Sequence, residues 1–252
     1  MLNILLCGCF GKMGKMVTEL LHERSDITLV GVDAIIPKGE SEFPIFRTFD
    51  EINIKSDVII DFSHHSLMPP LLDYIERTNT PAVLCTTGLD DAILARMQDV
   101  SKRVPLLHSG NMSLGINLLL KLVKQAAAVL GETFDIEIVE RHHNKKLDSP
   151  SGTAFMLAKE MNETLENSKA LTYGRFGKDA LRKKEEIGIH AVRGGTIVGE
   201  HSVIFAGVDE VIEINHRATS RRIFAAGAIK AAQFLVTQQP GMYSMDDVLK
   251  MD

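Results

Sequence analysis

Cysteine is scarce in this sequence, and the few cysteines do not form pairs. Only Cys7, Cys9 and Cys85 occur among 252 residues, and no CxxC motif is present. An odd number of unpaired cysteines does not suit a disulfide framework and is typical of a protein in a reducing compartment. Neither the cysteines nor the histidines have the spacing of a zinc site, so we expect no metal.

The sequence also lacks an excess of positive charge and any long apolar run. The formal net charge is −5, and an acidic surface attracts neither nucleic acid nor an anionic membrane. No stretch reaches the roughly 18–20 apolar residues of a membrane span. The apolar start, Met1 to Leu6, has no basic residue before it and runs directly into glycines, unlike a signal peptide. We expect a cytoplasmic protein without nucleic-acid or membrane partners.

No internal repeat or low-complexity segment is present, so the elements are inferred from hydrophobic periodicity. The first half contains short β-rich runs at Ile4 to Cys7, Ile27 to Val32, Val58 to Phe62 and Ala82 to Cys85. Between the first two, Met13 to Arg24 repeats apolar positions with a helical period. This alternation predicts an α/β fold in which helices cover both faces of a parallel sheet.

The pattern changes after about residue 112. Leu114 to Leu130 predicts a long helix. One-sided strands are predicted at Phe134 to Ile138, Ile187 to Val192, Thr196 to Phe205 and Glu210 to Asn215. Strands without intervening helices favour a separate α+β domain, whereas the alanine-rich helix Arg222 to Val236 can return to the first domain. We expect one domain at 1–112 with 221–252 and another at 113–220.

The first strand leads into a glycine-rich turn, Gly8-Cys9-Phe10-Gly11-Lys12-Met13-Gly14. Glycine lets the backbone approach a pyrophosphate, and the helix that follows offers N–H groups to its oxygens. The second strand ends at Asp33, where a carboxylate binds the adenosine ribose and disfavours a 2′-phosphate. Position 34 is alanine and not an arginine that would bind that phosphate. Lys38 is near enough in the sequence to bind it, so NADPH stays an alternative. The turn therefore predicts NADH or NADPH, with NADH favoured; the alternative is a tight turn without a nucleotide.

A second polar segment, Glu140 to Thr153, precedes the helical run Ala154 to Leu165. Ser151 or Thr153 can cap that helix, and its first amides suit a carboxylate. Two histidines and two lysines just before the helix add a proton donor and positive charge. The segment indicates a pocket for an anionic substrate that is protonated during the reaction. The alternative is a solvated basic loop, which is also how we interpret the basic run Arg182 to Lys184.

Seven segments of the chain carry a resemblance to one enzyme family. They are Gly8 to Gly14, Cys85 to Gly88, Ser109 to Ser113, Glu140 to Ala154, Ile187 to Gly195, Val198 to His201 and His216 to Arg221. In these segments the chain resembles the 4-hydroxy-tetrahydrodipicolinate reductases, also called dihydrodipicolinate reductases. The HHxxKxDxPSGTA string from His142 to Ala154 is the most specific of them, and departures fall at Cys9, Phe10, Cys85 and Lys145.

The resemblance implies roles for individual residues. His142 matches the family's general acid, and Lys146 matches the lysine that binds a substrate carboxylate. Further substrate contacts are implied for Thr87, His143, Gly152 and Thr153. The implied dinucleotide site comprises Gly8, Gly11, Lys12, Met13, Gly14, Asp33, Phe62, Ser63, Cys85, Thr86, Thr87, Gly88, Ser109, Gly110, Asn111, Met112 and Arg221.

The resemblance also implies a fold, a reaction and an assembly. The implied fold is an N-terminal Rossmann dinucleotide-binding domain plus a mixed-sheet domain that binds substrate and joins subunits into a homotetramer. The implied reaction is the NAD(P)H-dependent reduction of dehydrated 4-hydroxy-tetrahydrodipicolinate to tetrahydrodipicolinate, in diaminopimelate and lysine biosynthesis. Two alternatives stay open, namely a related two-domain NAD(P)-dependent dehydrogenase of an amino-acid pathway and a non-catalytic nucleotide sensor.

Overall fold

The structure, a computed structural model, describes residues 1–22, 24–37 and 41–250. Contacts divide the chain into two compact units, Met1–Leu114 with Arg221–Asp252 and Gly115–Ser220. The chain therefore leaves the first unit after Leu114 and re-enters it at Arg221. Each unit has its own sheet and its own apolar core.

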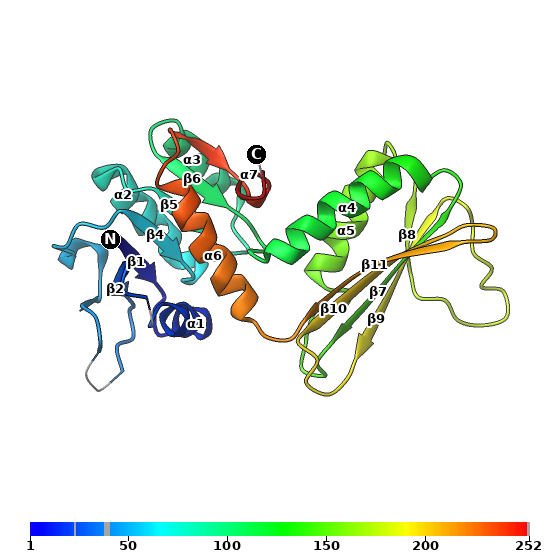
Figure 1. The fold of residues 1–252 in the computed structure, drawn as a ribbon, viewed down its shortest axis with the longest axis horizontal. Coiled ribbons are helices and arrows are strands. Elements are labelled where there is room, and N and C mark those ends of the chain that lie inside the picture. The colour runs from blue at the N-terminus through cyan, green and yellow to red at the C-terminus, as the bar shows by residue number, and fades with distance from the viewer. Residues whose placement is uncertain (23, 38–40, 251–252) are drawn as a thin grey trace. The chain divides into compact units, whose positions relative to one another are not determined.

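The first unit is built on a parallel sheet (Figure 1). Within the described residues it has seven strands in the order β12-β6-β5-β4-β1-β2-β3, with every pairing parallel. The strands are β1 (Leu2–Cys7), β2 (Ile27–Val32), β3 (Ile45–Phe46), β4 (Val58–Asp61), β5 (Ala82–Leu84), β6 (Pro105–His108) and β12 (Gly241–Tyr243). The strand order reverses at β1, and ligands of such sheets bind at the carboxyl ends beside the reversal.

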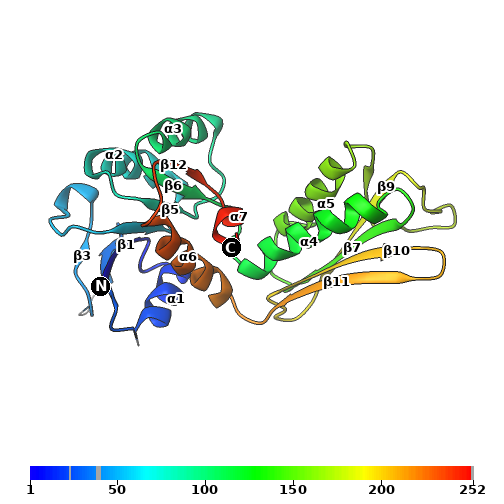
Figure 2. The same ribbon diagram turned by 45° about the horizontal axis from the view of Figure 1, so that its top comes forward.

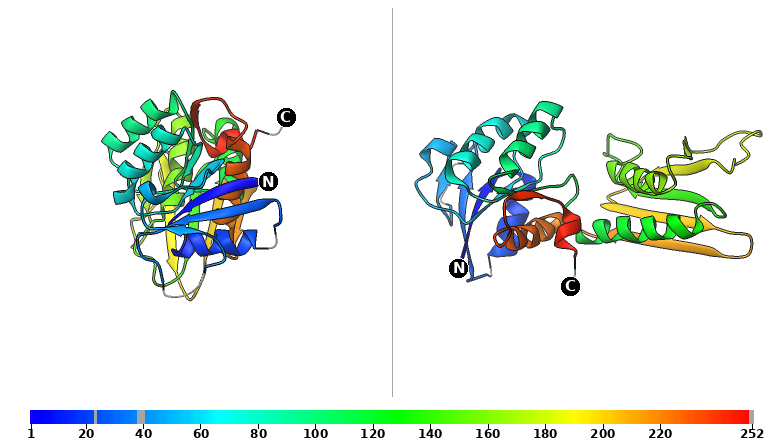
Figure 3. Two further views of the ribbon diagram at one scale, coloured as in Figure 1. Left: turned by 90° about the vertical axis from the view of Figure 1, so that its left-hand side faces the viewer. Right: turned by 90° about the horizontal axis from the view of Figure 1, so that it is seen from above.

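Helices cover both faces of this sheet, as the alternating sequence pattern predicts (Figures 1 and 3). One face packs against α1 (Lys12–Leu21) and α6 (Arg222–Leu235), and the other against α2 (Met68–Thr78) and α3 (Asp91–Ser101). The short helices are η1 (Phe49–Glu51), η2 (His65–Leu67) and α7 (Met245–Val248). α1 ends before the expected Arg24, and residue 23 of that prediction lies outside the described residues. No helix in the described ranges is long and apolar enough to cross a membrane.

The second unit is built on a mixed sheet, in agreement with the fold that the family resemblance implies. Its described residues form five strands in the order β11-β10-β7-β9-β8; β10 pairs antiparallel with β7 and β11, and β9 pairs parallel with β7 and β8. The strands are β7 (Asp135–His142), β8 (Ala170–Tyr173), β9 (Glu186–Arg193), β10 (Gly199–Ala206) and β11 (Val211–Ala218). Helices α4 (Leu114–Leu130) and α5 (Gly152–Thr164) cover one face of this sheet (Figure 2).

The strict alternation of β7 places a charged side chain in the buried row of the sheet. Ile136 and Ile138 point into the core beneath α4 and α5, and the same row continues with Glu140 and His142. Glu140 is fully buried and His142 is 8% exposed. Burial of a carboxylate is costly unless charged or hydrogen-bonded partners surround it, so this row marks a constructed polar site.

On the opposite face of β7, the structure differs from one expectation of the sequence analysis. The basic run Arg182 to Lys184 was expected to be a solvated loop, and for Arg182 this is wrong. Its guanidinium pairs with Asp135 at 2.6 Å and with Glu137 at 3.0 Å, whereas Lys183 and Lys184 are exposed. The odd positions of β7 present carboxylates on this face, and they attract the arginine of the neighbouring loop.

Candidate active site

The glycine turn after β1 is shaped by backbone contacts that exclude side chains. Gly8 has a φ of +74°, and a Cβ there would lie 2.7 Å from the Phe62 carbonyl oxygen. A Cβ on Gly14 would lie 2.3 Å from the Gly8 carbonyl oxygen. Gly11 is the N-cap of α1 and provides no capping side chain. The first amides of α1 are therefore left for an anionic ligand, so the turn fits a pyrophosphate.

Asp33 is tied directly to this turn. One oxygen of its carboxylate accepts the Phe10 N–H at 3.0 Å, and the other accepts the Ile35 N–H at 3.2 Å. The carboxylate has lone pairs left for further donors such as ribose hydroxyls. Lys38, which the sequence offered as a possible cation for NADPH, lies outside the described residues.

The loops after β4 and β5 are held by a buried carboxylate, Asp61. It accepts the Ser63 N–H at 3.0 Å, the Ser63 hydroxyl at 2.5 Å and the Thr86 hydroxyl at 2.6 Å. Burial raises the pKa of Asp61, and the bonds from Ser63 and Thr86 oppose that rise. Sequence reasoning named Phe62, Ser63 and Thr86 but missed the group that positions them, although a polar residue ending an apolar strand was a readable signal.

The remaining nucleotide candidates of this unit also follow strand ends. Thr87 and Gly88 are exposed after β5, and the Ser109 hydroxyl donates to the Asn111 carbonyl at 2.9 Å after β6. Met112 is only 2% exposed and belongs to the core beside α6, so its side chain is not offered to solvent. Arg221 is the N-cap residue of α6 and is exposed.

In the second unit, the Glu140 carboxylate accepts hydrogen bonds from several groups in and beside the polar segment. Glu140 accepts two bonds from the Arg193 guanidinium, each 2.7 Å long, and one from His142 Nδ1 at 2.6 Å. Its other oxygen also accepts the Ser151 N–H at 2.9 Å. Arg193 in turn donates to the Asp148 carbonyl at 2.8 Å. Strand register explains why Arg193 lies close to Glu140, since His142 is opposite Arg193 in the β7–β9 pair.

These contacts fix the protonation pattern of His142. Burial by itself would raise the pKa of Glu140, but Arg193, His142 and the Ser151 amide together hold it below its ordinary value. An ionised carboxylate only accepts hydrogen bonds, so the proton of a neutral His142 is on Nδ1 and its Nε2 is left for the exchangeable proton. Burial lowers the pKa of His142, Glu140 opposes that shift, and Lys146 and Arg193 add to it.

The surroundings of His142 Nε2 leave little spare room. A Cβ on Gly199, at the start of β10, would lie 3.0 Å from this nitrogen. The His201 ring lies edge-on to the His142 ring, with centroids 5.2 Å apart. Burial lowers the pKa of His201 to about 3, so His201 is neutral and does not act as a second acid near neutral pH.

The amino end of α5 lies in the same cluster. Ser151 is its N-cap, as expected, and accepts the Ala154 N–H; Gly152 is exposed and Thr153 is half-buried. Lys146 Nζ contacts the Asp148 carboxylate at 2.8 Å. Lys146 and, more weakly, the Gly152 amide lower the pKa of Asp148. In this structure Asp148 thus contacts Lys146, the group that the resemblance assigns to a substrate carboxylate. His143 is half-buried, and Lys145 is exposed.

Sequence reasoning did not assign roles to Glu140, Arg193 or His201. Glu140 was visible as the third member of the row Ile136, Ile138, Glu140, in which an apolar residue was expected. Arg193 and His201 carry no local signal, because strand pairing places them opposite His142 and Glu140, which are more than fifty positions away in the sequence.

Family models for two halves of one enzyme match almost the whole chain. The model described as "Dihydrodipicolinate reductase, N-terminus" matches residues 2–112, and the one described as "Dihydrodipicolinate reductase, C-terminus" matches residues 115–249. The 4-hydroxy-tetrahydrodipicolinate reductase of Caldanaerobacter subterraneus subsp. tengcongensis is 50% identical over 251 residues, covering 99% of each chain. That of Clostridium botulinum is 47% identical over 251 residues, covering 99% of this chain and 98% of the relative.

A solved structure shares the fold. The dipicolinate-bound dihydrodipicolinate reductase of Paenisporosarcina sp. matches with a TM-score of 0.82 and 22% identity, covering 99% of this chain and 100% of that chain. At this identity the match speaks for the fold alone. The two family models and the full-length relatives carry the assignment, and by them the chain belongs to the dihydrodipicolinate reductase family.

Proposed function

We propose that the protein reduces the dehydrated form of 4-hydroxy-tetrahydrodipicolinate to tetrahydrodipicolinate with NADH or NADPH, in the biosynthesis of diaminopimelate and lysine. The names of the full-length relatives support the reaction. The observation that carries the chemical assignment is the bond of Glu140 to both His142 Nδ1 and the Ser151 N–H. This arrangement sets a proton donor beside the amino end of α5, which suits an anion.

The nucleotide is assigned to the carboxyl ends of the first sheet. Gly8, Gly11, Lys12, Met13 and Gly14 would hold the pyrophosphate, and Asp33 the adenosine ribose. The neighbouring strand ends would contribute Phe62, Ser63, Cys85, Thr86, Thr87, Gly88, Ser109, Gly110, Asn111, Met112 and, from the start of α6, Arg221. When bound, NADH or NADPH supplies the hydride that the ring carbon receives. Asp33 favours NADH because its charge repels a 2′-phosphate.

The substrate is assigned to the amino end of α5. Lys146 and the amides of Gly152 and Thr153 would bind a carboxylate of the ring, with His143 and Thr87 as further contacts. Asp148 would have to leave Lys146 as the substrate carboxylate arrives, since both anions need the same ammonium group. A relative in the family was solved with dipicolinate bound, a planar ring dicarboxylate of the same general shape.

His142 is assigned as the general acid. Hydride addition to a conjugated imine leaves negative charge on the ring, and a proton from His142 Nε2 completes the addition. Glu140 keeps Nδ1 protonated and stabilises the imidazolium, so the proton leaves from the opposite nitrogen. Burial lowers the pKa of His142, and the negative charge of a bound dicarboxylate opposes that effect.

The alternatives fit the residues less well. A related dehydrogenase that works through an active-site nucleophile needs a reactive cysteine in the second domain, but Cys7, Cys9 and Cys85 all lie in the first. Burial also raises the pKa of all three, that of Cys9 to about 11. A non-catalytic nucleotide sensor has no need for a proton donor oriented by a buried carboxylate. The Glu140–His142 pair therefore favours an enzyme over a sensor.

We assign nucleotide binding to 1–112 with 221–252, and substrate binding with subunit contacts to 113–220. The second sheet has one face without helices, where Val192 and Val211 are 45% and 59% exposed. Apolar side chains on such a face suit pairing with another subunit. Light scattering should give the mass of a homotetramer; a monomer at micromolar concentration would contradict this assignment.

The reaction is tested by following the loss of nicotinamide absorbance. The unstable substrate is generated in place from pyruvate and aspartate semialdehyde by the upstream synthase, and NADH and NADPH are compared in parallel. We expect oxidation that requires both this protein and the synthase. Absence of oxidation with either nucleotide, from folded protein that binds the nucleotide, would contradict the proposed reaction.

A further inference from the structure

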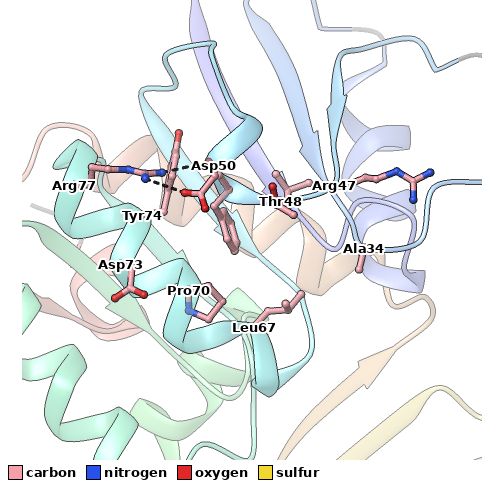
Figure 4. A pocket seen from close by; sticks show the side chains of 11 residues that line it. Ala34, Arg47, Thr48, Asp50, Leu67, Pro70, Asp73, Tyr74 and Arg77 are labelled. Atoms are coloured by element: carbon pink, nitrogen blue, oxygen red, sulfur yellow. Dashed lines mark hydrogen bonds and ion pairs between the residues drawn. The ribbon is translucent and has the colours of Figure 1, made fainter.

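The cavity drawn in Figure 4 belongs to the first unit, at the proposed nucleotide end of its sheet. It has a volume of about 320 Å³, and Val32 and Ala34, the residues on either side of Asp33, are part of its lining. The substrate is assigned instead to the amino end of α5, in the second unit. There the proposed mechanism leaves one buried histidine, His201, without a role.

His201 occupies an inward position of β10. Buried and half-buried residues alternate along this strand, and Val203 and Phe205 of the buried row lie beneath α4 and α5. His201 is 4% exposed in the same row and lies opposite Glu140 in the β10–β7 pair. A polar ring in an apolar row is unfavourable unless it is hydrogen-bonded, so its partner indicates what the ring contributes.

The partner of His201 is Ser151, the N-cap residue of α5. Ser151 Oγ lies 3.1 Å from His201 Nε2 and accepts the Ala154 N–H at 3.2 Å. The backbone N–H of Ser151 donates to Glu140 at 2.9 Å. Two residues that lie opposite each other in β7 and β10 thus hold Ser151, Glu140 by its N–H group and His201 by its hydroxyl group. Ser151 is 2% exposed, so both bonds are shielded from water.

The direction of the bond between His201 and Ser151 follows from the groups available to each. Burial lowers the pKa of His201 to about 3, so the ring is neutral and has a proton on one nitrogen. If Ser151 donates to Nε2, that proton is on Nδ1, which has no hydrogen-bond partner among the described residues. If Nε2 donates instead, both Nδ1 and the hydroxyl hydrogen of Ser151 are left unpaired. The first arrangement leaves fewer buried groups unpaired, so His201 is the acceptor and Ser151 the donor.

His201 and Glu140 differ in their contacts with the general acid. Glu140 accepts the bond from His142 Nδ1, whereas the His201 ring lies edge-on to the His142 ring, with centroids 5.2 Å apart. Glu140 can therefore influence both the proton and the bound anion. His201 acts through Ser151 on the first amides of α5, which follow Ser151 directly and suit a carboxylate.

We propose that His201 is a positioning residue for substrate binding: by accepting the Ser151 hydroxyl, it fixes the direction in which the first amides of α5 meet a substrate carboxylate. The inference rests on the proposed function, because it takes the amino end of α5 as the carboxylate site. His201 needs no contact with the substrate ring for this role. Binding of the dicarboxylate should depend on His201, whereas proton transfer from His142 and nucleotide binding should not.

The test compares His201→Leu, which has no acceptor, with His201→Gln, whose side-chain oxygen can accept the Ser151 hydroxyl. Turnover is measured with substrate generated by the upstream synthase, and dipicolinate binding is measured by calorimetry in the presence of NADH. We expect His201→Leu to raise the KM for substrate and the Kd for dipicolinate by about tenfold, because a buried hydrogen bond is lost. The pH dependence of kcat/KM should keep its midpoint, because the bond between Glu140 and His142 remains. His201→Gln should restore both constants to within about threefold of the unchanged protein.

His216→Leu is the matched control. His216 is a second histidine whose pKa is lowered by burial, and it lies opposite His201 in the β10–β11 pair, but the Ser151 hydroxyl is bonded to His201. The control should leave the KM for substrate and the Kd for dipicolinate unchanged. Equal effects of His201→Leu and His216→Leu would reduce the result to the loss of a histidine from the sheet and overturn the proposal.

Ser151→Ala tests the same bond from the other side, because it removes the hydroxyl and keeps the N–H that donates to Glu140. It should raise both constants at least as much as His201→Leu, and combining the two substitutions should add little, because they remove one bond. If His201→Leu does not melt cooperatively, an unchanged KM in Ser151→Ala overturns the proposal.

The remaining outcomes separate the inference from the proposed function. Additive effects of Ser151→Ala and His201→Leu would overturn the inference, as would a His201→Gln variant no better than His201→Leu. A lowered kcat and a shifted pH profile with unchanged KM in His201→Leu would also overturn it, because His201 would then act on His142. In each of these cases the unchanged protein still reduces the substrate and the proposed function stands. Failure of the unchanged protein to reduce the substrate would instead contradict the proposed function, and the inference with it.

Discussion

The glycine turn Gly8–Gly14 and the polar segment Glu140–Thr153 both lie between a strand and a helix, but they are shaped by different forces. In the turn, the backbone packs against itself so closely that a Cβ on Gly14 would lie 2.3 Å from a carbonyl oxygen. In the segment, one buried carboxylate holds a histidine, an arginine and a backbone amide. The first site depends on the absence of side chains, and the second on a network of them.

This difference determines how each site should respond to mutation. Substitutions in the network should alter proton transfer while leaving nucleotide binding intact, because the proposed nucleotide residues other than Arg221 lie within 1–112. In each variant, turnover is therefore measured together with NADH affinity. A fall in NADH affinity in these variants would break the distinction between the two sites.

The largest effect is expected from His142→Gln. Loss of the general acid should lower kcat by about a hundredfold or more, with NADH affinity unchanged. Steady-state turnover and calorimetric NADH binding on the same preparation check both parts. Near-normal turnover would remove His142 from the mechanism.

The next effect is expected from Glu140→Gln, which keeps the shape of the side chain but removes its charge. We expect kcat/KM to fall by roughly tenfold, because a charge-assisted bond to His142 is lost. The active form is protonated, so kcat/KM declines as pH rises through the His142 pKa, which burial holds below its ordinary value. Because Glu140 raises that pKa, the decline in Glu140→Gln should move to lower pH. An unmoved pH profile, in a variant that still melts cooperatively, would reduce Glu140 to a structural role.

A smaller effect is expected from Gly199→Ala. The added methyl group would meet His142 Nε2 at 3.0 Å and should displace the ring, lowering kcat by about fivefold. Gly194→Ala is the matched control, because a Cβ there meets nothing within 4 Å. Equal kcat values for the two variants would show that the space beside Nε2 is not used in turnover.

The smallest effect is expected from Asp148→Asn. The Lys146–Asp148 contact is partly exposed, so its loss should free the ammonium group and lower the KM for substrate by up to about threefold. Initial rates over a range of substrate concentrations measure this. A raised KM would mean that Asp148 helps to bind the substrate instead of competing with it.

The sequence predicted the fold class because long elements leave a periodic pattern. Alternating runs predicted a parallel sheet covered on both faces, and the one-sided strands predicted a second sheet; the structure confirms both. Four short strands were missed, namely β3, β6, β8 and β12. They have two to four residues, too few to display a period, and each depends on pairing with a neighbouring strand.

The candidate sites differ in the same way. The glycine turn can be recognised from local spacing, because the constraints on Gly8 and Gly14 act within a few residues. The partner of Glu140, Arg193, lies 53 residues away and meets it only when β7 pairs with β9. The individual site roles stay predictions until variants are measured.

The proposed proton transfer depends most directly on the tautomer of His142. Long-range proton–nitrogen NMR of histidine-labelled protein distinguishes the two ring nitrogens, and the His142→Gln spectrum identifies the signal. Above the His142 pKa, we expect a proton on Nδ1, bound to Glu140, and no proton on Nε2. The opposite tautomer, with the proton on Nε2, would contradict the orientation of the acid by Glu140.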